Sequence, residues 1–328
     1  MSRIFDALKR SEGEREGNDA APISEGPELL QRAEHHFVSN LETATSLREQ
    51  EGVHVPGLRN SAGQEAGRSD GASSFTLPSA ERRSADQRLA LLMRARELSI
   101  AVPGESRLVC VTDRECPTAE AVRLLGVRLR DLRRIRPLKK VLVTSTIPRE
   151  GKTTMAANLA CALAHGSEEK VLLIEGDVRL PALRQMFGIG YIPGISEMVE
   201  DGHKLQDCIY RLDGANIWLL PAGRIPPNPL EIIQSQKLPE AMDELAECFD
   251  WIIIDSPPVL PLADTSIWMR LSDGILLVTR QGVTERQQLQ KGTEALEPKK
   301  VLGALLNGSA ASVYSGYYYR TRPNSDSA

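Results

Sequence analysis

The chain has 328 residues, a formal net charge of -4 and 41% hydrophobic residues, which is ordinary for a soluble globular protein. The N-terminal "MSRIFDALKR" lacks the long apolar core of a signal peptide, and no run of about 18 apolar residues could span a bilayer. The five cysteines are scattered without the spacing of a disulfide framework or a zinc site, which favours reduced thiols. We therefore expect a cytoplasmic protein.

Residues 1–104 are predicted to form a mostly flexible N-terminal arm that carries amphipathic helical segments. In residues 27–50, the apolar side chains of Leu30, Ala33, Phe37 and Leu41 recur at the spacing of one helix face. The stretch between about residues 51 and 85 is rich in glycine, serine and charge and holds too few apolar groups to fold alone. Two interpretations stay open, a disordered extension and an arm that docks on a partner.

Residues 105–310 are predicted to form one α/β domain. Short apolar runs recur along it, and helical patterns or loops separate them; the runs are "KKVLVTS", "KVLLIEGD", "NIWLLPA", "WIIIDS", "GILLVTR" and "KKVLGALLN". Continuous Val/Ile/Leu runs are typical of strands buried on both faces, so the pattern predicts a mostly parallel sheet flanked by helices. Ligands of such sheets bind beyond the carboxyl ends of the strands.

A phosphate-binding loop is predicted directly after the first of these strands. The sequence "TIPREGKTTMAANLACALAHG" places Gly151, Lys152 and Thr153 at the start of a helix that ends near Gly166. In a P-loop the backbone N–H groups hold phosphates, the lysine meets the terminal phosphates and the threonine hydroxyl binds Mg²⁺. The usual first glycine, five residues before Gly151, is Thr146 in this chain.

Acidic residues follow the next two strands. The run "VLLIEGDVR" supplies Glu175, Asp177 and Arg179, and alternate residues of an extended chain share one side, so we expect these three to point together toward the loop. The run "WIIIDSPP" supplies Asp255 in the position of a Walker B aspartate that holds Mg²⁺. The sequence therefore predicts a nucleotide-binding fold of the P-loop NTPase class.

Together these motifs resemble those of the bacterial tyrosine autokinases of exopolysaccharide and capsule biosynthesis, P-loop proteins unrelated to eukaryotic protein kinases. The matching segments are "STIPREGKTT", "LLIEGDVR", "IIIDSPP" and a tyrosine-rich tail, with further likeness in "LPAGRIPPNPLEII", "TAEAVRLLGVRLR" and "MSRIFDALKR". The resemblance covers about residues 105–320 and, in the arm, only its start. Residues 311–328 form the tail, which holds Tyr314, Tyr317, Tyr318 and Tyr319.

The resemblance implies an ATP- and Mg²⁺-dependent autokinase whose phosphoacceptors are the four tail tyrosines. It implies that Glu175 contacts the attacking tyrosine, that Lys152 neutralises the transferred phosphoryl group, and that Mg²⁺ is held by Thr153, Asp177 and Asp255. Arg179 is expected to brace the two carboxylates beside it. The expected nucleotide contacts, with Arg280 and Asn307 added by analogy with related P-loop ATPases, are Pro148, Glu150, Gly151, Lys152, Thr153, Thr154, Arg179, Arg280 and Asn307.

The resemblance also implies partners. Family members without a transmembrane segment work with a separate membrane protein of the chain-length-determining type, so we expect such a partner and an indirect association with the inner face of the membrane. Transfer between neighbouring copies in a ring is implied as well. The basic run at residues 128–140 is interpreted as the solvated face of a helix, with contact to anionic lipid or an acidic partner as the alternative. Nucleic-acid binding is not expected, because no recognised module accompanies the run.

Two positions depart from the family pattern. Glu175 stands where the family has aspartate, which shifts the carboxylate by about 1–1.5 Å. Gly126 stands at the third place of the family's Glu-x-x-Arg-x-x-Arg helix, after Glu120 and Arg123. Two other functions remain open: a partitioning or site-determining switch ATPase, which shares the fold and a related P-loop, and a degenerate ATP-binding scaffold, which Glu175 leaves open. The switch ATPases usually carry a lysine near the start of the loop, and residues 141–151 contain none.

Overall fold

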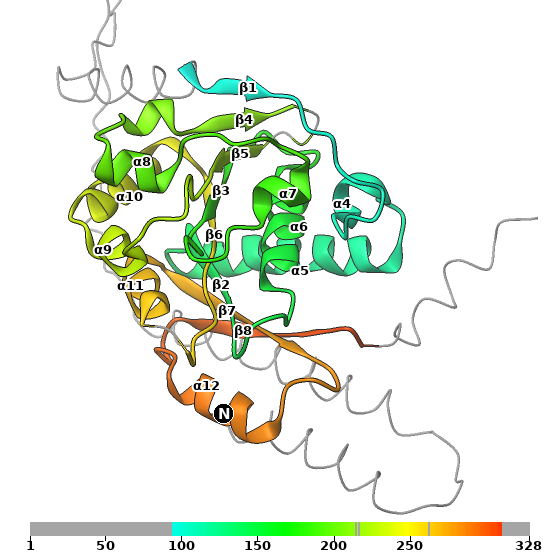
Figure 1. Ribbon diagram of the computed structural model, residues 1–328. Coiled ribbons are helices and arrows are strands. Elements are labelled where there is room, and N and C mark those ends of the chain that lie inside the picture. The colour runs from blue at the N-terminus through cyan, green and yellow to red at the C-terminus, as the bar shows by residue number, and fades with distance from the viewer. Residues whose placement is uncertain (1–93, 214, 216, 262, 310–328) are drawn as a thin grey trace, which may run out of the picture. The chain divides into compact units, whose positions relative to one another are not determined.

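The computed structural model describes residues 94–213, 215, 217–261 and 263–309 (Figure 1). The helical segments expected in the first fifty residues and the tyrosine tail lie outside the described residues. Among the described residues, no helix is long and apolar enough to cross a membrane.

One eight-stranded sheet organises the described fold, with the order β1-β4-β5-β3-β6-β2-β7-β8. All neighbouring strands are parallel except β4 and β5, which confirms the predicted mostly parallel sheet. The strands are β1 (Arg96–Leu98), β2 (Lys140–Ser145), β3 (Val171–Glu175), β4 (Tyr210–Leu212), β5 (Ile217–Leu220), β6 (Trp251–Asp255), β7 (Gly274–Arg280) and β8 (Val301–Asn307). Each of the six apolar runs contains one of these strands.

Helices cover both faces of the sheet (Figure 1). The remaining elements are α4 (Val109–Thr112), α5 (Pro117–Ile135), α6 (Lys152–Ala164), α7 (Leu183–Phe187), α8 (Ile195–Glu200), the 3-10 turn η1 (Leu205–Asp207), α9 (Pro229–Gln234), α10 (Lys237–Cys248), α11 (Asp264–Leu271) and α12 (Arg286–Glu294). On one face α6 packs against β2, β3 and β6, and α5 lies on α6; on the other face α10 and α11 contact β6 and β2. Ligand-binding loops are therefore confined to the edges of the sheet.

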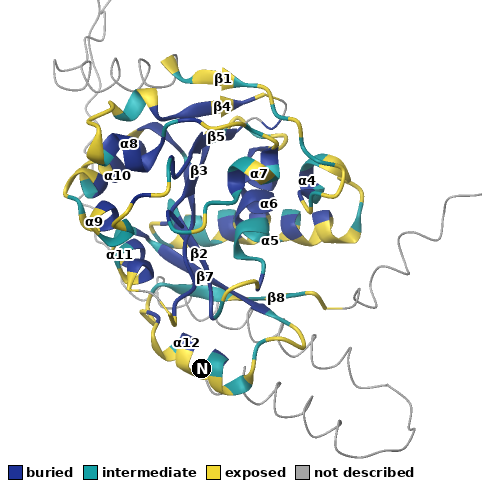
Figure 2. Cartoon of the chain, in the orientation of Figure 1, coloured by how far each residue is buried: buried dark blue, intermediate teal, exposed yellow. Residues whose placement is uncertain are grey.

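The central strands and α6 form the core, which is dark blue in Figure 2. Every residue of β3 and β6 is buried, and so is every residue of α6 from Ala156 to Ala164. Small alanine side chains let α6 lie between the sheet and α5. A β-carbon built on Gly126 of α5 would lie 3.5 Å from Leu163 Cδ2, in ordinary contact. This packing anchors the helix that begins at Lys152.

The sheet begins before residue 105, the expected start of the domain. Strand β1 pairs in parallel with β4, from Arg96 opposite Tyr210 to Leu98 opposite Leu212. Two of its three residues are exposed. Such a short, exposed edge strand has no apolar run, which is why the sequence pattern assigned it to the arm.

The basic run at residues 128–140 is largely bound to the fold instead of forming a free solvated face. Arg130 Nε and Arg133 Nη1 lie 2.8 Å and 3.5 Å from carboxylate oxygens of Glu169. Lys139 Nζ donates to the carbonyl of Ala246 at 2.6 Å. These contacts tie the end of α5 and the start of β2 to neighbouring elements, so the run needs no outside partner to explain its charge.

Candidate active site

The predicted acidic and phosphate-binding motifs meet at the carboxyl edge of three adjacent strands. Strand β6 lies between β2 and β3, with Asp255 opposite Val143 on one side and Glu175 on the other. The loop of residues 146–151 follows β2 and leads into α6. Residues far apart in the sequence are therefore brought together by the parallel sheet alone.

The loop before α6 has the backbone that phosphate binding requires. Gly151, the N-cap of α6, has φ of 94°, in the left-handed region, and Arg149 has φ of 69°. Within the described residues no side chain caps the first turn of α6. Its N–H groups and the positive end of the helix dipole are thus available to an anion.

Glu150 supports this loop from within. Its side chain is buried, its Oε2 accepts the N–H of Ile147 at 2.8 Å, and its Oε1 accepts the hydroxyl of Thr284. The carboxylate therefore holds the loop in shape, and the backbone of Glu150 is the part left for a nucleotide.

Arg280 and Asn307, which end β7 and β8, also contact this loop. Arg280 Nη1 donates to the carbonyl of Arg149 at 3.3 Å, and Asn307 Nδ2 donates to the carbonyl of Glu150 at 2.8 Å. A β-carbon built on Gly151 would lie 2.2 Å from Asn307 Nδ2. Both side chains thus brace the backbone of the P-loop, and the nucleotide contacts expected of them by analogy stay a prediction.

Lys152 lies between the two acidic motifs. Its Nζ is 3.0 Å from Asp177 Oδ2 and 3.5 Å from Thr153 Oγ1. Burial acts to lower the pKa of Lys152, but the carboxylates of Asp255 and Asp177 outweigh it and hold the pKa above its ordinary value. The ammonium group therefore stays charged where phosphates would arrive.

Asp255 is the carboxylate best suited to a metal. It is 1% exposed, and its Oδ1 has no hydrogen-bond partner among the described residues. Burial raises its pKa to about 7, although the charge of Lys152 and the hydroxyl of Thr153 act in the opposite direction. An unpaired buried carboxylate oxygen is costly unless a ligand uses it. Asp255, Thr153 and Asp177 supply the hard oxygen ligands that Mg²⁺ prefers.

These protein oxygens are too few to hold a metal alone. No group of three or more His, Cys, Asp or Glu side chains able to bind a metal occurs in the part of the chain that the structure describes. Mg²⁺ in nucleotide sites is usually bound by one or two carboxylates together with phosphate oxygens and water. The donor set therefore fits a magnesium–nucleotide complex and not a resident metal.

The expectation that Glu175, Asp177 and Arg179 point together is wrong. Strand β3 ends at Glu175, so the alternation of an extended chain does not continue. Asp177 turns to Lys152, but Arg179 forms a two-pronged pair with Asp264 of α11, at 2.7 Å and 3.1 Å. Arg179 therefore braces α11 and not the two carboxylates. Asp264 was not predicted as a site residue, because it lies outside every motif quoted above.

Glu175 is turned away from Lys152 toward two backbone segments. Its Oε1 accepts the N–H of Leu183 at 2.6 Å, and its Oε2 accepts the N–H of Ala222 at 3.0 Å. Burial raises its pKa, and the backbone N–H groups of Ala222, Leu183 and Ala182 act to lower it.

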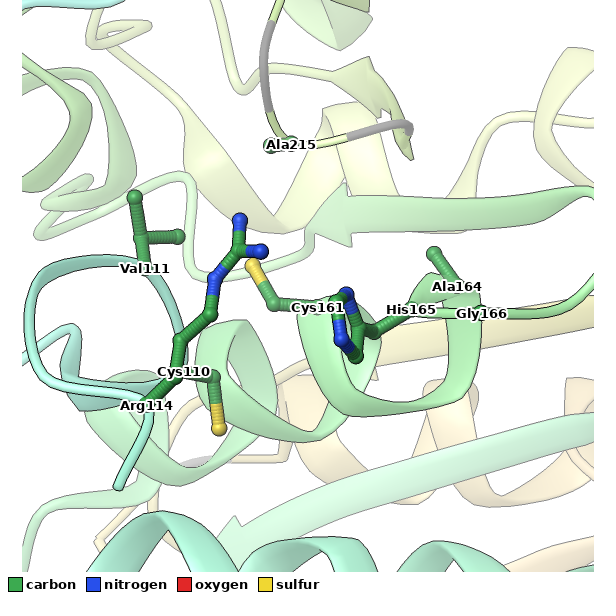
Figure 3. A pocket seen from close by; sticks show the side chains of 8 residues that line it. All are labelled: Cys110, Val111, Arg114, Cys161, Ala164, His165, Gly166 and Ala215. Atoms are coloured by element: carbon green, nitrogen blue, oxygen red, sulfur yellow. The ribbon is translucent and has the colours of Figure 1, made fainter. Parts of the chain in front are cut away.

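A pocket of about 210 Å³ lies elsewhere, between α4 and the end of α6 (Figure 3). It is lined by Cys110, Val111, Arg114, Cys161, Ala164, His165, Gly166 and Ala215. Burial raises the pKa of Cys110 to about 11 and that of Cys161 to about 12, so both thiols are protonated at neutral pH. None of the predicted catalytic, metal-binding or nucleotide-binding residues lines this pocket, so the candidate active site is defined by the motifs at the sheet edge.

Comparison with known proteins identifies relatives among bacterial tyrosine kinases. Residues 149–291 match a family model described as an AAA domain. The tyrosine-protein kinase YwqD of Bacillus subtilis is 33% identical over 223 residues, which cover 67% of this chain and 94% of the relative. The kinase domain of the Escherichia coli tyrosine kinase ETK is similar with a TM-score of 0.60 and 26% identity, over 67% of this chain and 87% of that domain.

The chimerical protein CapA2B2 is a further structural neighbour, with a TM-score of 0.58 and 27% identity, over 68% of this chain and 97% of the chimera. Gly151, Lys152 and Thr153 of the P-loop and both acidic motifs lie within residues 149–291, the segment that the family model matches. This chain belongs to the family of bacterial tyrosine-protein kinases.

Proposed function

We propose that the chain is an ATP- and Mg²⁺-dependent tyrosine autokinase that phosphorylates Tyr314, Tyr317, Tyr318 and Tyr319. The observation that carries the proposal is the position of Asn307, the last residue of β8, which is bonded to the P-loop at Glu150. Strand β8 therefore ends at the edge of the sheet where the phosphates would bind. Seven residues of extended chain, from Asn307 to Tyr314, reach roughly 23–25 Å.

The chain's own residues supply binding and charge. The loop N–H groups and Lys152 hold the phosphates of ATP, and Thr153, Asp177 and Asp255 hold Mg²⁺. The bound metal would offset negative charge on the phosphates. The acceptor tyrosine has a pKa near ~10 in water, so it must lose its proton as its oxygen bonds to the γ-phosphorus and ADP departs. The carboxylates at the sheet edge are the nearby groups that could assist this loss.

The biological setting follows from the family. We place the kinase at the inner face of the membrane, bound to a membrane-embedded protein of the chain-length-determining type. In that setting, phosphorylation of the tail would regulate polymerisation or export of an exopolysaccharide. A nucleic-acid partner is not part of the proposal.

Association between copies is also proposed, but not through the family's complete helix motif. Arg123 pairs with Glu120 on α5 at 2.6 Å, so those two positions are in place. Gly126 is buried against Leu163 of α6, so an arginine at this position would point into the fold. Any contact between copies through α5 must therefore use other exposed residues of that helix, such as Leu124, which is 50% exposed.

Mass spectrometry of the tail tests the kinase proposal. Purified full-length protein is incubated with Mg²⁺ and ATP, with and without the cytoplasmic segment of a candidate membrane partner. We expect phosphate on the tail peptide of the wild type and none on a Lys152→Ala sample, which has lost the cation of the P-loop. A tail that stays unmodified in every sample, despite measurable ATP binding, would leave the switch ATPase or the scaffold as the function.

A further inference from the structure

Glu175 is fully enclosed by backbone that it binds. Its side chain is 0% exposed, and its two oxygens accept different N–H groups, from Leu183 at 2.6 Å and from Ala222 at 3.0 Å. These bonds hold the carboxylate against backbone inside the fold, where it has no exposed surface to meet a phenol. Moving the carboxylate away would leave two buried N–H groups unpaired, which is unfavourable.

The two bound segments follow neighbouring strands of the sheet, β3 and β5. Leu183 begins α7, after the loop that carries Asp177, and its N–H has no partner within its own helix because it lies in the first turn. Ala222 follows β5, the neighbour of β3 in the sheet. The carboxylate of Glu175 therefore sets the distance between the loop after β3 and the loop after β5.

The loop after β5 is held equally firmly on its other side. The carbonyls of Pro221 and Ala222 accept N–H groups from the first turn of α8, at 2.9 Å and 3.0 Å. Glu197 of α8 accepts the N–H of Arg224 at 3.0 Å. Helix α8 holds this loop from one side. Because Glu175 bonds to Ala222 in this loop and to Leu183 at the start of α7, it holds α7 at a fixed distance from the loop.

Both loops expose a large apolar residue. Leu180 is 73% exposed and follows Arg179, and its N–H donates to Asp177 Oδ1 at 3.2 Å. Ile225 is 62% exposed and follows Arg224 in the other loop. Leu180 is exposed next to Asp177, the carboxylate that pairs with Lys152, so its side chain is suited to contact an aromatic acceptor.

We infer that Glu175 is a positioning residue for the acceptor side of the site, which fixes the loop at residues 180–183 against the loop at residues 221–225. This inference rests on the proposed kinase function. The glutamate is then required for its length, because an aspartate is shorter by one carbon–carbon bond, about 1.5 Å, and cannot reach both N–H groups. Glu175, which stands where the family has aspartate, thus has a structural role in this chain and does not act as the carboxylate that contacts the tyrosine.

The variant Glu175→Asp separates the two roles, because it restores the residue of the family pattern. Full-length kinase is incubated with Mg²⁺, ATP and full-length Lys152→Ala acceptor labelled with ¹⁵N, so that the acceptor's tail peptide is distinguished by mass. We expect kcat to fall about tenfold or more while the KM for ATP changes less than twofold, since misplacement by about 1 Å can cost a hundredfold in rate. A kcat that rises in Glu175→Asp would overturn the inference.

Hydrogen–deuterium exchange tests the anchor without relying on kinase activity. In Glu175→Asp, amide exchange is expected to rise in both segments, at residues 182–183 and 222–224, and to stay unchanged in β6. If the wild type fails to phosphorylate its tail, the proposed function is lost, but the exchange result still decides whether Glu175 joins the loops. Unchanged exchange in both segments would refute the anchor.

Asp273→Ala is the matched control. Asp273 Oδ2 also accepts two backbone N–H groups, from Lys139 at 3.0 Å and from Lys140 at 2.8 Å, but at the amino end of β2, on the opposite edge of the sheet. We expect this variant to lower the melting temperature and leave kcat within twofold. An equal fall in kcat in Asp273→Ala would mean that general destabilisation explains the Glu175→Asp result, and the positioning role would be rejected.

Discussion

Asp255→Asn is expected to abolish phosphorylation of the tail and yet to make the nucleotide-free protein more stable at pH 8. The amide keeps the shape of the carboxylate but loses the charge that a metal needs. Without the metal, the transition state loses several kcal/mol of stabilisation, so the rate of phosphorylation falls by about a hundredfold or more. The remaining carboxylate next to Lys152, that of Asp177 at 3.0 Å, keeps the ammonium group paired.

The stability gain follows from the direction of the Asp255 pKa. Burial raises this pKa from its ordinary value of 3.8 to about 7. Between these values the folded state binds more protons than the unfolded state, so stability falls as the pH rises and the full penalty is present above about pH 7. Asparagine does not titrate and avoids the penalty. The increase in melting temperature should therefore be larger at pH 8 than at pH 5.

Thermal melts at both pH values and mass spectrometry of the tail measure the two effects. Asp250→Asn is the control, because it removes the same charge from a carboxylate at the amino edge of the sheet, where Asp250 Oδ2 accepts the N–H of Lys170 at 2.8 Å. Equal gains at pH 5 and pH 8 would contradict the argument about the pKa. Phosphorylation that persists in Asp255→Asn would remove Asp255 from the site.

The nucleotide side of this site could be predicted from the sequence because the sheet itself creates it. Val/Ile/Leu runs buried on both faces mark parallel strands, and whatever follows them must meet at one edge. Lys152 and Asp255 each follow or end such a strand, so their proximity required no knowledge of side-chain packing. Asn307 and Arg280 also end strands at this edge, where they bond to the loop backbone.

The acceptor side could not be predicted in the same way. The alternation argument for Glu175 and Arg179 assumed extended chain beyond residue 175, and the strand ends there. The actual partners are distant in sequence: Arg179 binds Asp264, 85 residues away, and Glu175 binds Ala222, 47 residues away. Such contacts depend on how loops pack, and no periodic pattern records them.

The residue that replaces the usual first glycine of the P-loop is accommodated by a glycine elsewhere in the chain. Thr146 occupies that place and is fully buried, and Gly292 of α12 lies against it. A β-carbon built on Gly292 would lie 2.8 Å from Thr146 Cγ2. The larger residue in the loop is therefore accommodated by the smallest residue in a helix far along the chain, which the sequence alone does not reveal.

Gly151→Ala is expected to remove nucleotide binding and to destabilise the fold by about 2–3 kcal/mol. Gly151 has φ of 94°, and a residue with a β-carbon loses roughly 1–2 kcal/mol in the left-handed region. The new methyl would also lie 2.2 Å from Asn307 Nδ2, which must move and abandon its bond to Glu150. A net hydrogen bond contributes about 1 kcal/mol. The displaced loop no longer presents its N–H groups to the phosphates together.

Asn307→Ala and the double variant divide this loss into its two causes. Asn307→Ala alone removes only the hydrogen bond to Glu150, so it should cost about 1 kcal/mol and weaken ATP binding modestly. In Gly151→Ala with Asn307→Ala the clash is gone but the backbone strain remains, so the double variant should be more stable than the sum of the single losses predicts. Melting curves with and without ATP and Mg²⁺ measure each variant. Wild-type ATP affinity in Gly151→Ala would mean that the loop does not bind phosphate in this conformation.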